Sequence, residues 1–80
     1  MTDQEILDVF TRVLRDLLLN DILVLKPETW REDVPGWDSF NYINFIAAVE
    51  IEFGVKFRIA DVESFENVGA IIAATRKMLR

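Results

Sequence analysis

The fold of this chain is decided by Gly36-Trp37-Asp38-Ser39-Phe40 and the apolar-rich run that follows from Tyr42 to Phe53. The preceding Val34-Pro35-Gly36 is a turn signal, so we expect a helix to begin directly after Asp38. A polar group at that point lies beside a helix N-terminus, where free backbone N–H groups and the positive end of the helix dipole favour an anion. Two interpretations of Asp38-Ser39 follow. The pair is either a simple N-cap or the attachment point of a phosphate ester on Ser39.

The segment from Ser39 to Phe53 has the periodicity of a helix with two distinct faces. Apolar residues at spacings of three and four predict its buried face, namely Tyr42, Phe45, Ile46, Val49 and Phe53. Gly54 follows directly and suits the left-handed conformation of a helix C-cap. A second stripe is expected on the more exposed side, namely Phe40, Asn44, Ala47 and Ile51, with Asn41 beside it.

The N-terminal segment predicts a helix from about Asp3 to Leu19. Thr2 and Glu5 have the spacing of a capping box, and Asn20-Asp21 is a plausible stop. Helical spacing of apolar residues predicts a buried face made of Ile6, Phe10, Val13, Leu14, Leu17 and Leu18.

A long loop is predicted from Asn20 to Asp38, because Pro27, Pro35 and Gly36 are poor helix-interior residues. The loop is too apolar to lie free in water, so we expect it to pack against the helices. The side chains expected to pack are Ile22, Leu23, Leu25, Trp30, Val34 and Trp37.

The C-terminal third predicts an extended link, a short helix and a final helix. In the link, the alternating Val55, Phe57 and Ile59 are expected to close the core. The short helix is predicted over Ala60–Phe65, and Asn67 is expected to cap the last helix. That helix has an expected buried face of Val68, Ile71, Ile72, Thr75 and Leu79. The fold class is therefore all-α, a small right-handed bundle of three longer helices and one short helix, with a long loop between the first two.

Composition excludes several classes of protein. The 80 residues are enough for one small domain, here 1–80, and they include no cysteine and no histidine. Fourteen acidic against nine basic residues give a formal net charge of −5, which argues against nucleic acid and favours a basic protein surface as partner. No signal peptide and no membrane-spanning run are recognisable. We therefore expect a cytoplasmic protein that does not contact a membrane.

No set of residues predicts catalysis. Ser39 has no histidine or lysine base close in sequence. The carboxylates of Asp38, Glu50 and Glu52 do not match a calcium-binding loop or another recognisable metal site. We expect a protein that is not an enzyme and binds no metal.

Three segments together resemble the acyl carrier protein family. Asp38-Ser39-Phe40 is similar to the Asp-Ser-Leu motif that opens the second helix of these proteins. Glu50-Ile51-Glu52-Phe53-Gly54 is similar to the Glu-Glu-Phe-Gly-like end of that helix, and Ser64-Phe65-Glu66-Asn67-Val68 leads into the last helix. The resemblance covers almost the whole chain.

The resemblance implies a carrier function without intrinsic catalysis. Ser39 is implied to receive 4′-phosphopantetheine from coenzyme A, and Asp38 is implied to assist the complex with the modifying enzyme. The thiol of the arm would hold acyl intermediates as thioesters for fatty acid, polyketide or related specialised biosynthesis. Implied partners are the phosphopantetheinyl transferase (holo-acyl-carrier-protein synthase) and the enzymes that load and process acyl groups. We expect a monomer, and a phosphoprotein through the modified serine.

The expected partner surface departs from the family pattern. Family members that serve fatty acid synthesis have acidic residues where this chain has Asn41, Asn44 and Ile51, and Phe40 replaces leucine. Ile51 either marks a contact surface or is partly buried against the loop. Candidate partner-binding residues are Phe40, Asn41, Asn44, Ala47, Ile51, Asp61 and Glu63. We infer a stand-alone carrier of a specialised pathway. The alternatives are a peptidyl or aminoacyl carrier and an unmodified helical interaction domain.

Overall fold

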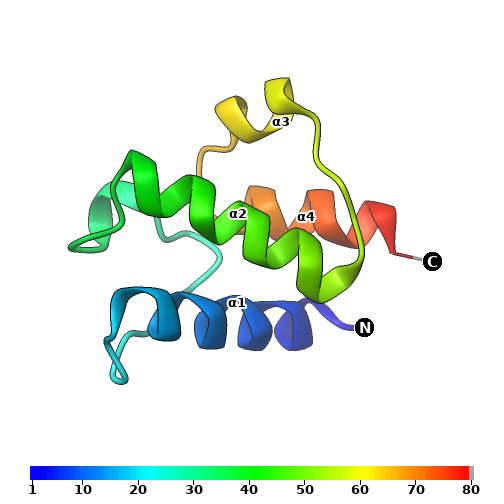
Figure 1. Cartoon of the computed structure of the whole chain (residues 1–80). Coiled ribbons are helices and arrows are strands. Elements are labelled where there is room, and N and C mark those ends of the chain that lie inside the picture. The colour runs from blue at the N-terminus through cyan, green and yellow to red at the C-terminus, as the bar shows by residue number, and fades with distance from the viewer. Residues whose placement is uncertain (80) are drawn as a thin grey trace.

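The chain folds into a bundle of helices, as Figure 1 shows. The computed structural model describes residues 1–79, and these form four α-helices, one 3-10 turn and no strand. The elements are α1 (Asp3–Leu18), η1 (Arg31–Asp33), α2 (Ser39–Phe53), α3 (Ile59–Ser64) and α4 (Val68–Met78). α1 packs against both α2 and α4, while the short α3 lies across the opposite side of α2. The predicted all-α fold class, with one short and three longer helices, is confirmed.

The ends of α1 follow from local chemistry. The predicted capping box is present: Thr2 Oγ1 accepts from the Glu5 backbone N–H at 3.1 Å, and Glu5 Oε1 accepts from the Thr2 N–H at 2.8 Å. The helix ends at Leu18, one residue earlier than predicted. Leu19 adopts the left-handed conformation at φ 53°, and its N–H donates to the Arg15 carbonyl.

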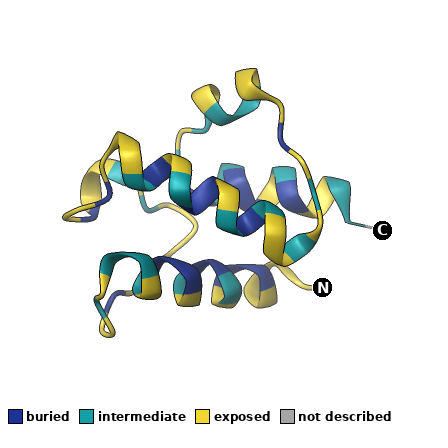
Figure 2. Cartoon of the chain, in the orientation of Figure 1, coloured by how far each residue is buried: buried dark blue, intermediate teal, exposed yellow. Residues whose placement is uncertain are grey.

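The core lies where α1, α2 and α4 meet, and Figure 2 shows their buried faces turned toward one another. Phe10 and Phe45 are fully buried and meet edge to face, with ring centroids 5.4 Å apart. Trp37 packs on the other side of Phe45 at 5.1 Å. Most residues of the predicted helix faces are buried, whereas Leu17, Leu18, Phe53 and Leu79 are only half-buried at the edges.

The long loop packs against the helices only in part. Leu23, Leu25, Val34 and Trp37 are buried as predicted. The prediction was wrong for Ile22, which is 85% exposed because it sits at the tip of a turn where Asn20 Oδ1 accepts its N–H. It was also wrong for Trp30, whose ring lines a surface hollow instead of the core.

Two backbone bonds attach the loop to the start of α4. The Val68 N–H donates to the Thr29 carbonyl at 2.9 Å, and the Gly69 N–H donates to the Pro27 carbonyl at 2.7 Å. A Cβ on Gly69 would lie 3.0 Å from that same Pro27 oxygen, so the close approach favours glycine. The loop is therefore fixed at its centre, which positions η1 beside α2.

The link after α2 differs from its prediction at one residue. Phe57 is buried and Val55 is half-buried, but Ile59 is 79% exposed. The reason is that α3 begins at Ile59 and ends at Ser64, one residue earlier at each end than predicted, so the alternation of the link stops before Ile59. Glu50 Oε2 accepts the Phe57 N–H at 2.9 Å and holds the link against α2.

Candidate functional site

The start of α2 presents an exposed serine hydroxyl. Asp38 is the N-cap, and its Oδ1 accepts the Asn41 backbone N–H at 2.9 Å. The Asn41 side chain donates in turn to the Gly36 carbonyl at 2.8 Å, and Gly36 takes a φ of 86° that favours glycine. Ser39 is then the first helical residue, and it is exposed. The turn and cap therefore direct an accessible hydroxyl to the positive end of the helix.

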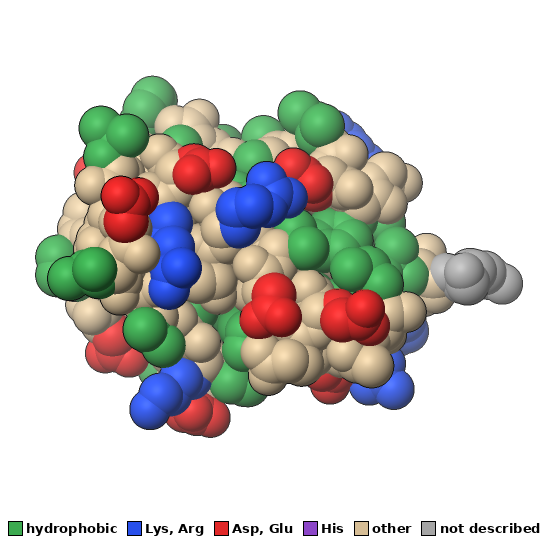
Figure 3. All heavy atoms as spheres, turned by 90° about the horizontal axis from the view of Figure 1, so that it is seen from below, with side chains coloured by type: hydrophobic (Ala, Val, Ile, Leu, Met, Phe, Trp, Pro, Cys, Tyr) green, Lys and Arg blue, Asp and Glu red, His purple; other side chains and the backbone are tan. Residues whose placement is uncertain are grey.

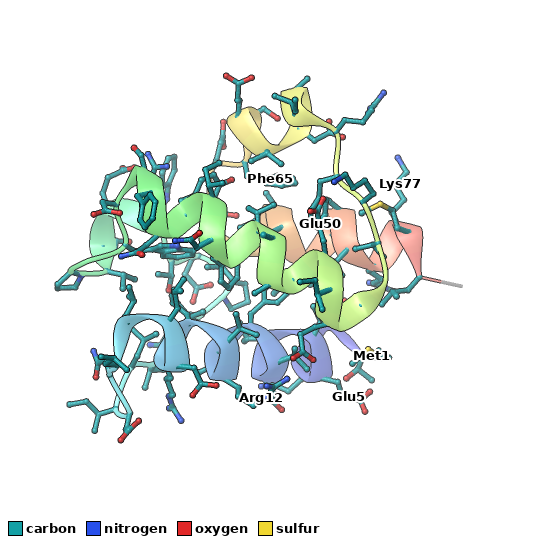
Figure 4. The ribbon with its side chains drawn as sticks, viewed as in Figure 1. Met1, Glu5, Arg12, Glu50, Phe65 and Lys77 are labelled. Carbon is teal, nitrogen blue, oxygen red and sulfur yellow. The ribbon has the colours of Figure 1, made fainter. Side chains whose placement is uncertain are left out.

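A surface hollow of about 420 Å³ lies directly beside Ser39. It is bounded by η1 with the residue before it, by the first turns of α2 and by the end of α3. Besides Ser39, its walls are formed by Trp30, Arg31, Glu32, Tyr42, Ile43, Val62, Glu63, Phe65 and Glu66. Figure 4 labels Phe65, which lies between α3 and α2.

Tyr42 connects the elements around this hollow. Its hydroxyl donates to the Val62 carbonyl at 2.6 Å, which joins α2 to α3. The Arg31 guanidinium lies over its ring, 4.9 Å from the centroid, in a cation–π contact. Burial raises the pKa of the Tyr42 phenol above its ordinary value, and the nearby Arg31 charge opposes that rise.

Sequence reasoning did not find the loop side of this site. Trp30 was assigned to the core, and Arg31 was not considered. The sequence did contain one signal: Trp30 and Arg31 lie nine and eight positions before Ser39, in a loop whose apolar content indicates packing against the helices. Only the attachment of the loop to α4 shows that these residues lie beside Ser39.

The second face of α2 forms a stripe, which we call the contact stripe and define as Phe40, Ile43, Asn44, Ala47 and Ile51. All of these residues are exposed except Asn44, which is half-buried. Phe40 is 75% exposed and Ile51 82%, so the interpretation that Ile51 is partly buried is wrong. Ile43 was not predicted here, yet it is 57% exposed. The stripe begins next to Ser39 and runs about 17 Å along the helix, at 1.5 Å per residue.

The acidic residues of α2 are already engaged within the chain. Glu52 pairs with Arg12 of α1 at 3.0 Å. Glu50, labelled in Figure 4, accepts the Phe57 N–H and has Lys56 Nζ 3.9 Å away. The face formed by α1, seen in Figure 3, carries acidic and basic side chains intermixed. The contact stripe therefore offers apolar side chains and amides rather than free carboxylates.

The two predicted partner residues on α3 separate in the structure. Glu63 is exposed and lines the hollow beside Ser39. Asp61 instead pairs with Arg58 at 3.2 Å and faces a different hollow, with Lys56 and Lys77. Only Glu63 is thus brought together with the serine.

Among residues 1–79, no three carboxylate side chains are grouped closely enough to hold a metal ion. In the same part of the chain, no helix is both long enough and apolar enough to cross a membrane.

Comparison with known proteins gives a clear relative. No protein-family model matches the sequence. Among solved structures, the solution NMR structure of a holo acyl carrier protein from Geobacter metallireducens is similar to this chain, with a TM-score of 0.81. The two are 31% identical, and the similarity covers 89% of this chain and 82% of that one. The chain therefore belongs to the acyl carrier protein family, whose members act as carriers and not as enzymes.

Proposed function

We propose that Ser39 Oγ carries 4′-phosphopantetheine and that the chain presents acyl groups on this arm to partner enzymes. The observation that supports the proposal is the exposed hydroxyl of Ser39, placed at the first position of α2 by the Asp38 cap. A related protein of known structure is described as a holo acyl carrier protein.

The residues at this position fit a phosphodiester. A negative charge at a helix N-terminus is stabilised by about 0.3–1 kcal/mol when exposed. The Asp38 carboxylate is occupied by the Asn41 N–H, so it serves to define the helix start and leaves the serine hydroxyl free for reaction. The hollow beside Ser39 also gives an arm attached there a surface on which to lie.

When bound, the group supplies a terminal thiol, which this cysteine-free chain does not have. The chain itself contributes the acceptor oxygen. In the transfer reaction, Ser39 Oγ forms the new bond to phosphorus and its proton passes to the transferase. The pyrophosphate bond of coenzyme A breaks, and adenosine 3′,5′-bisphosphate leaves.

The direct test is intact-mass analysis after incubation with coenzyme A and a broad-specificity phosphopantetheinyl transferase. We expect a gain of one phosphopantetheine group that maps to Ser39 by peptide fragmentation. A Ser39→Ala variant should remain folded, because an exposed first-turn position tolerates alanine, and should gain nothing. Modification of that variant, or an unmodified wild type beside a modified control carrier, contradicts the proposal.

We propose the contact stripe as the surface that partner enzymes cover, together with Asn41, Asp61 and Glu63. Any enzyme that acts on an arm at Ser39 must approach the molecule beside Phe40 and Ile43. Glu50, Glu52 and Asp61 are already paired within the chain, and the contact stripe itself carries no charge, so this contact depends on apolar burial more than on charge. This surface supports a dedicated carrier of a specialised pathway rather than one that docks by acidic residues.

The transferase itself serves as the partner in a test of this surface. Ile51→Ser removes an exposed apolar side chain and should raise the KM for the carrier without changing its unfolding temperature. The exposed Ala73→Ser on α4 is the matched control and should change neither quantity. Wild-type KM should rise little with added salt, because screening acts on charges. A steep salt dependence would instead indicate electrostatic docking.

A further inference from the structure

A second hollow, of about 620 Å³, lies between α4 and the link that leads into α3. We call it the basic hollow and define it by its lining residues, which are Lys56, Phe57, Arg58, Asp61, Phe65, Ala73, Ala74, Lys77 and Met78. Figure 4 labels Phe65, which follows α3, and Lys77, which belongs to α4. Of these residues only Phe65 also borders the hollow beside Ser39, so the two hollows are different places on the surface.

The inner surface of the basic hollow is apolar. Phe57 is buried, and its ring meets that of Phe65 edge to face with centroids 5.6 Å apart. The wall on α4 contributes Ala73, Ala74 and Met78, which lie within about one turn of each other on the same side of the helix. Because alanine side chains are short, this side of α4 leaves a space that an apolar side chain from another molecule can fill.

The rim of the basic hollow carries three cations on two walls. Lys56 and Arg58 come from the link and Lys77 comes from α4. The side chains of Lys56 and Arg58 are 89% and 85% exposed, and Lys77 is exposed as well. The cationic groups are therefore accessible from solvent on both sides of the apolar surface.

Carboxylates within the chain engage these cations only in part. Asp61 pairs with Arg58 at 3.2 Å, and Lys56 Nζ lies 3.9 Å from Glu50, at the limit of an ion pair. Among residues 1–79, no carboxylate lies within ion-pair distance of Lys77. Exposed pairs of this kind contribute little, so these cations remain available to a ligand.

The local charge of the basic hollow is opposite to that of the whole molecule. Its lining has three bases and one acid, whereas the chain has a formal net charge of −5. A membrane or a nucleic acid presents negative charge over a wide area, which would also face the acidic remainder of the surface. The charge distribution therefore favours an anionic ligand that is only as wide as the hollow.

The placement of the cations on two walls favours a ligand with several carboxylates. The single head group of a small amphiphile meets one wall and leaves the cations of the other wall without a partner. A peptide segment that carries acidic side chains on both sides of an apolar side chain can meet both walls at once. The same segment covers the apolar surface between them.

We propose that the basic hollow binds an acidic segment of a partner protein. An apolar side chain of that segment packs on Phe65 and Met78, and its carboxylates pair with Lys56, Arg58 and Lys77. This surface shares no residue with the contact stripe and recognises its partner by charge, which the contact stripe does not carry. The inference goes beyond the proposed function and does not depend on modification of Ser39.

The test uses the unmodified wild-type chain and three synthetic peptides of equal length that form amphipathic helices. The first peptide has a stripe of leucine flanked on both sides by glutamate. The second replaces each glutamate by lysine, and the third replaces each leucine by serine. Binding is followed through methyl resonances in heteronuclear NMR, where Ala73, Ala74 and Met78 report on the basic hollow and Ile43 and Ile51 report on the contact stripe.

We expect the leucine–glutamate peptide to shift Ala73, Ala74 and Met78 and to leave Ile43 and Ile51 unchanged. An exposed ion pair changes an affinity by up to about fivefold, so the lysine peptide, which loses several pairs, should bind at least that much more weakly. The serine peptide should also bind more weakly, because it lacks the apolar anchor. Equal binding of the glutamate and lysine peptides, shifts at the contact stripe instead of the hollow, or no binding at all would overturn the proposal.

Two charge reversals assign the attraction to the rim. Lys56→Glu and Lys77→Glu change exposed side chains on the link and on α4, so both variants should remain folded. Each should weaken binding of the leucine–glutamate peptide by about fivefold or more, because an attraction becomes a repulsion. Lys26→Glu, an exposed loop lysine outside the hollow, is the matched control. If it weakens binding as much as Lys77→Glu does, the peptide responds only to total charge and the proposal is wrong.

Vesicles of phosphatidylglycerol separate a protein partner from a membrane surface. We expect them to leave Ala73, Ala74 and Met78 unshifted, because the acidic remainder of the chain is repelled by a wide anionic surface. Shifts of these residues by the vesicles as large as those caused by the leucine–glutamate peptide would overturn the assignment of a protein partner. None of these measurements uses a transferase, so their failure is distinct from failure of the mass test on Ser39.

Discussion

Removal of one hydroxyl group measures how firmly α3 is held to the bundle. Tyr42→Phe deletes the donor of the 2.6 Å bond to the Val62 carbonyl and leaves the ring in place. The contacts of the ring with Arg31 and Trp37 therefore remain. The net contribution of such a bond is about 0.5–1.5 kcal/mol. For a domain of this size, each kcal/mol corresponds to about 4–8 °C in Tm. We expect Tyr42→Phe to lower the free energy of unfolding and the Tm by these amounts at neutral pH.

The same hydroxyl predicts a pH dependence with a definite sign. Burial raises the pKa of Tyr42 in the folded state above the ordinary value of 10.0. Below pH 10 the phenol is neutral in both folded and unfolded chains, so its stabilising contribution is fully present. Above pH 10 the phenol of the unfolded chain loses its proton first, which favours unfolding. The stabilising contribution of the hydroxyl group is therefore lost as the pH rises through the folded-state pKa. The difference in stability between wild type and Tyr42→Phe should therefore shrink above pH 10.

Urea unfolding followed by circular dichroism, at neutral pH and above pH 10, measures both effects. Tyr42 is the single tyrosine of the chain, so phenolate absorbance gives its folded-state pKa without overlap. Equal stability of the two proteins at neutral pH would refute the reasoning about the hydrogen bond. If the difference in stability between wild type and Tyr42→Phe stayed the same above pH 10, the reasoning from the raised pKa of Tyr42 would be refuted.

The remaining predictions concern packing and helix ends, and each is measured by urea unfolding at neutral pH. Phe45→Ala should cost about 3–5 kcal/mol, because the ring is fully buried between Phe10 and Trp37; a loss below about 1 kcal/mol would show that the core collapses around the gap. Gly54→Ala should cost about 1–2 kcal/mol from backbone strain alone, since φ is 65° and no atom lies within 4 Å of the new Cβ. Asp38→Ala should cost about 1 kcal/mol through loss of the cap to Asn41, whereas Asp38→Asn should cost less; equal losses would show that the charge matters more than the cap.

Much of the fold could be predicted because its signals are local. The Thr2–Glu5 capping box, the Asp38 cap and Gly54 mark helix ends through bonds between residues at most four apart. Apolar periodicity predicted the buried faces of α1, α2 and α4, because one helical face must lie away from water. The boundary errors are of one residue, at Leu19 and around α3.

The errors inside the predicted segments have a different cause. Ile22, Trp30 and Ile59 were assigned to the core on the basis of hydrophobicity, and all three are exposed. Hydrophobicity indicates that a side chain gains by burial but does not give the direction in which a turn or helix start points it. These directions depend on the Asn20 turn and on where α3 begins.

The candidate site also has one part that local sequence predicts and one part that depends on tertiary packing. The sequence by itself determined Asp38 and Ser39 at the start of a helix, because capping and the end of a helix are properties of neighbouring residues. Only the tertiary structure decided that Arg31 lies over Tyr42, that Tyr42 bonds to Val62, and that a hollow forms beside Ser39. These contacts join residues separated by eleven and twenty positions, and their geometry depends on how α4 holds the loop and how α2 holds α3. Long-range packing of this kind leaves no periodic or motif signal in the chain, so it became visible only when the helices were placed together.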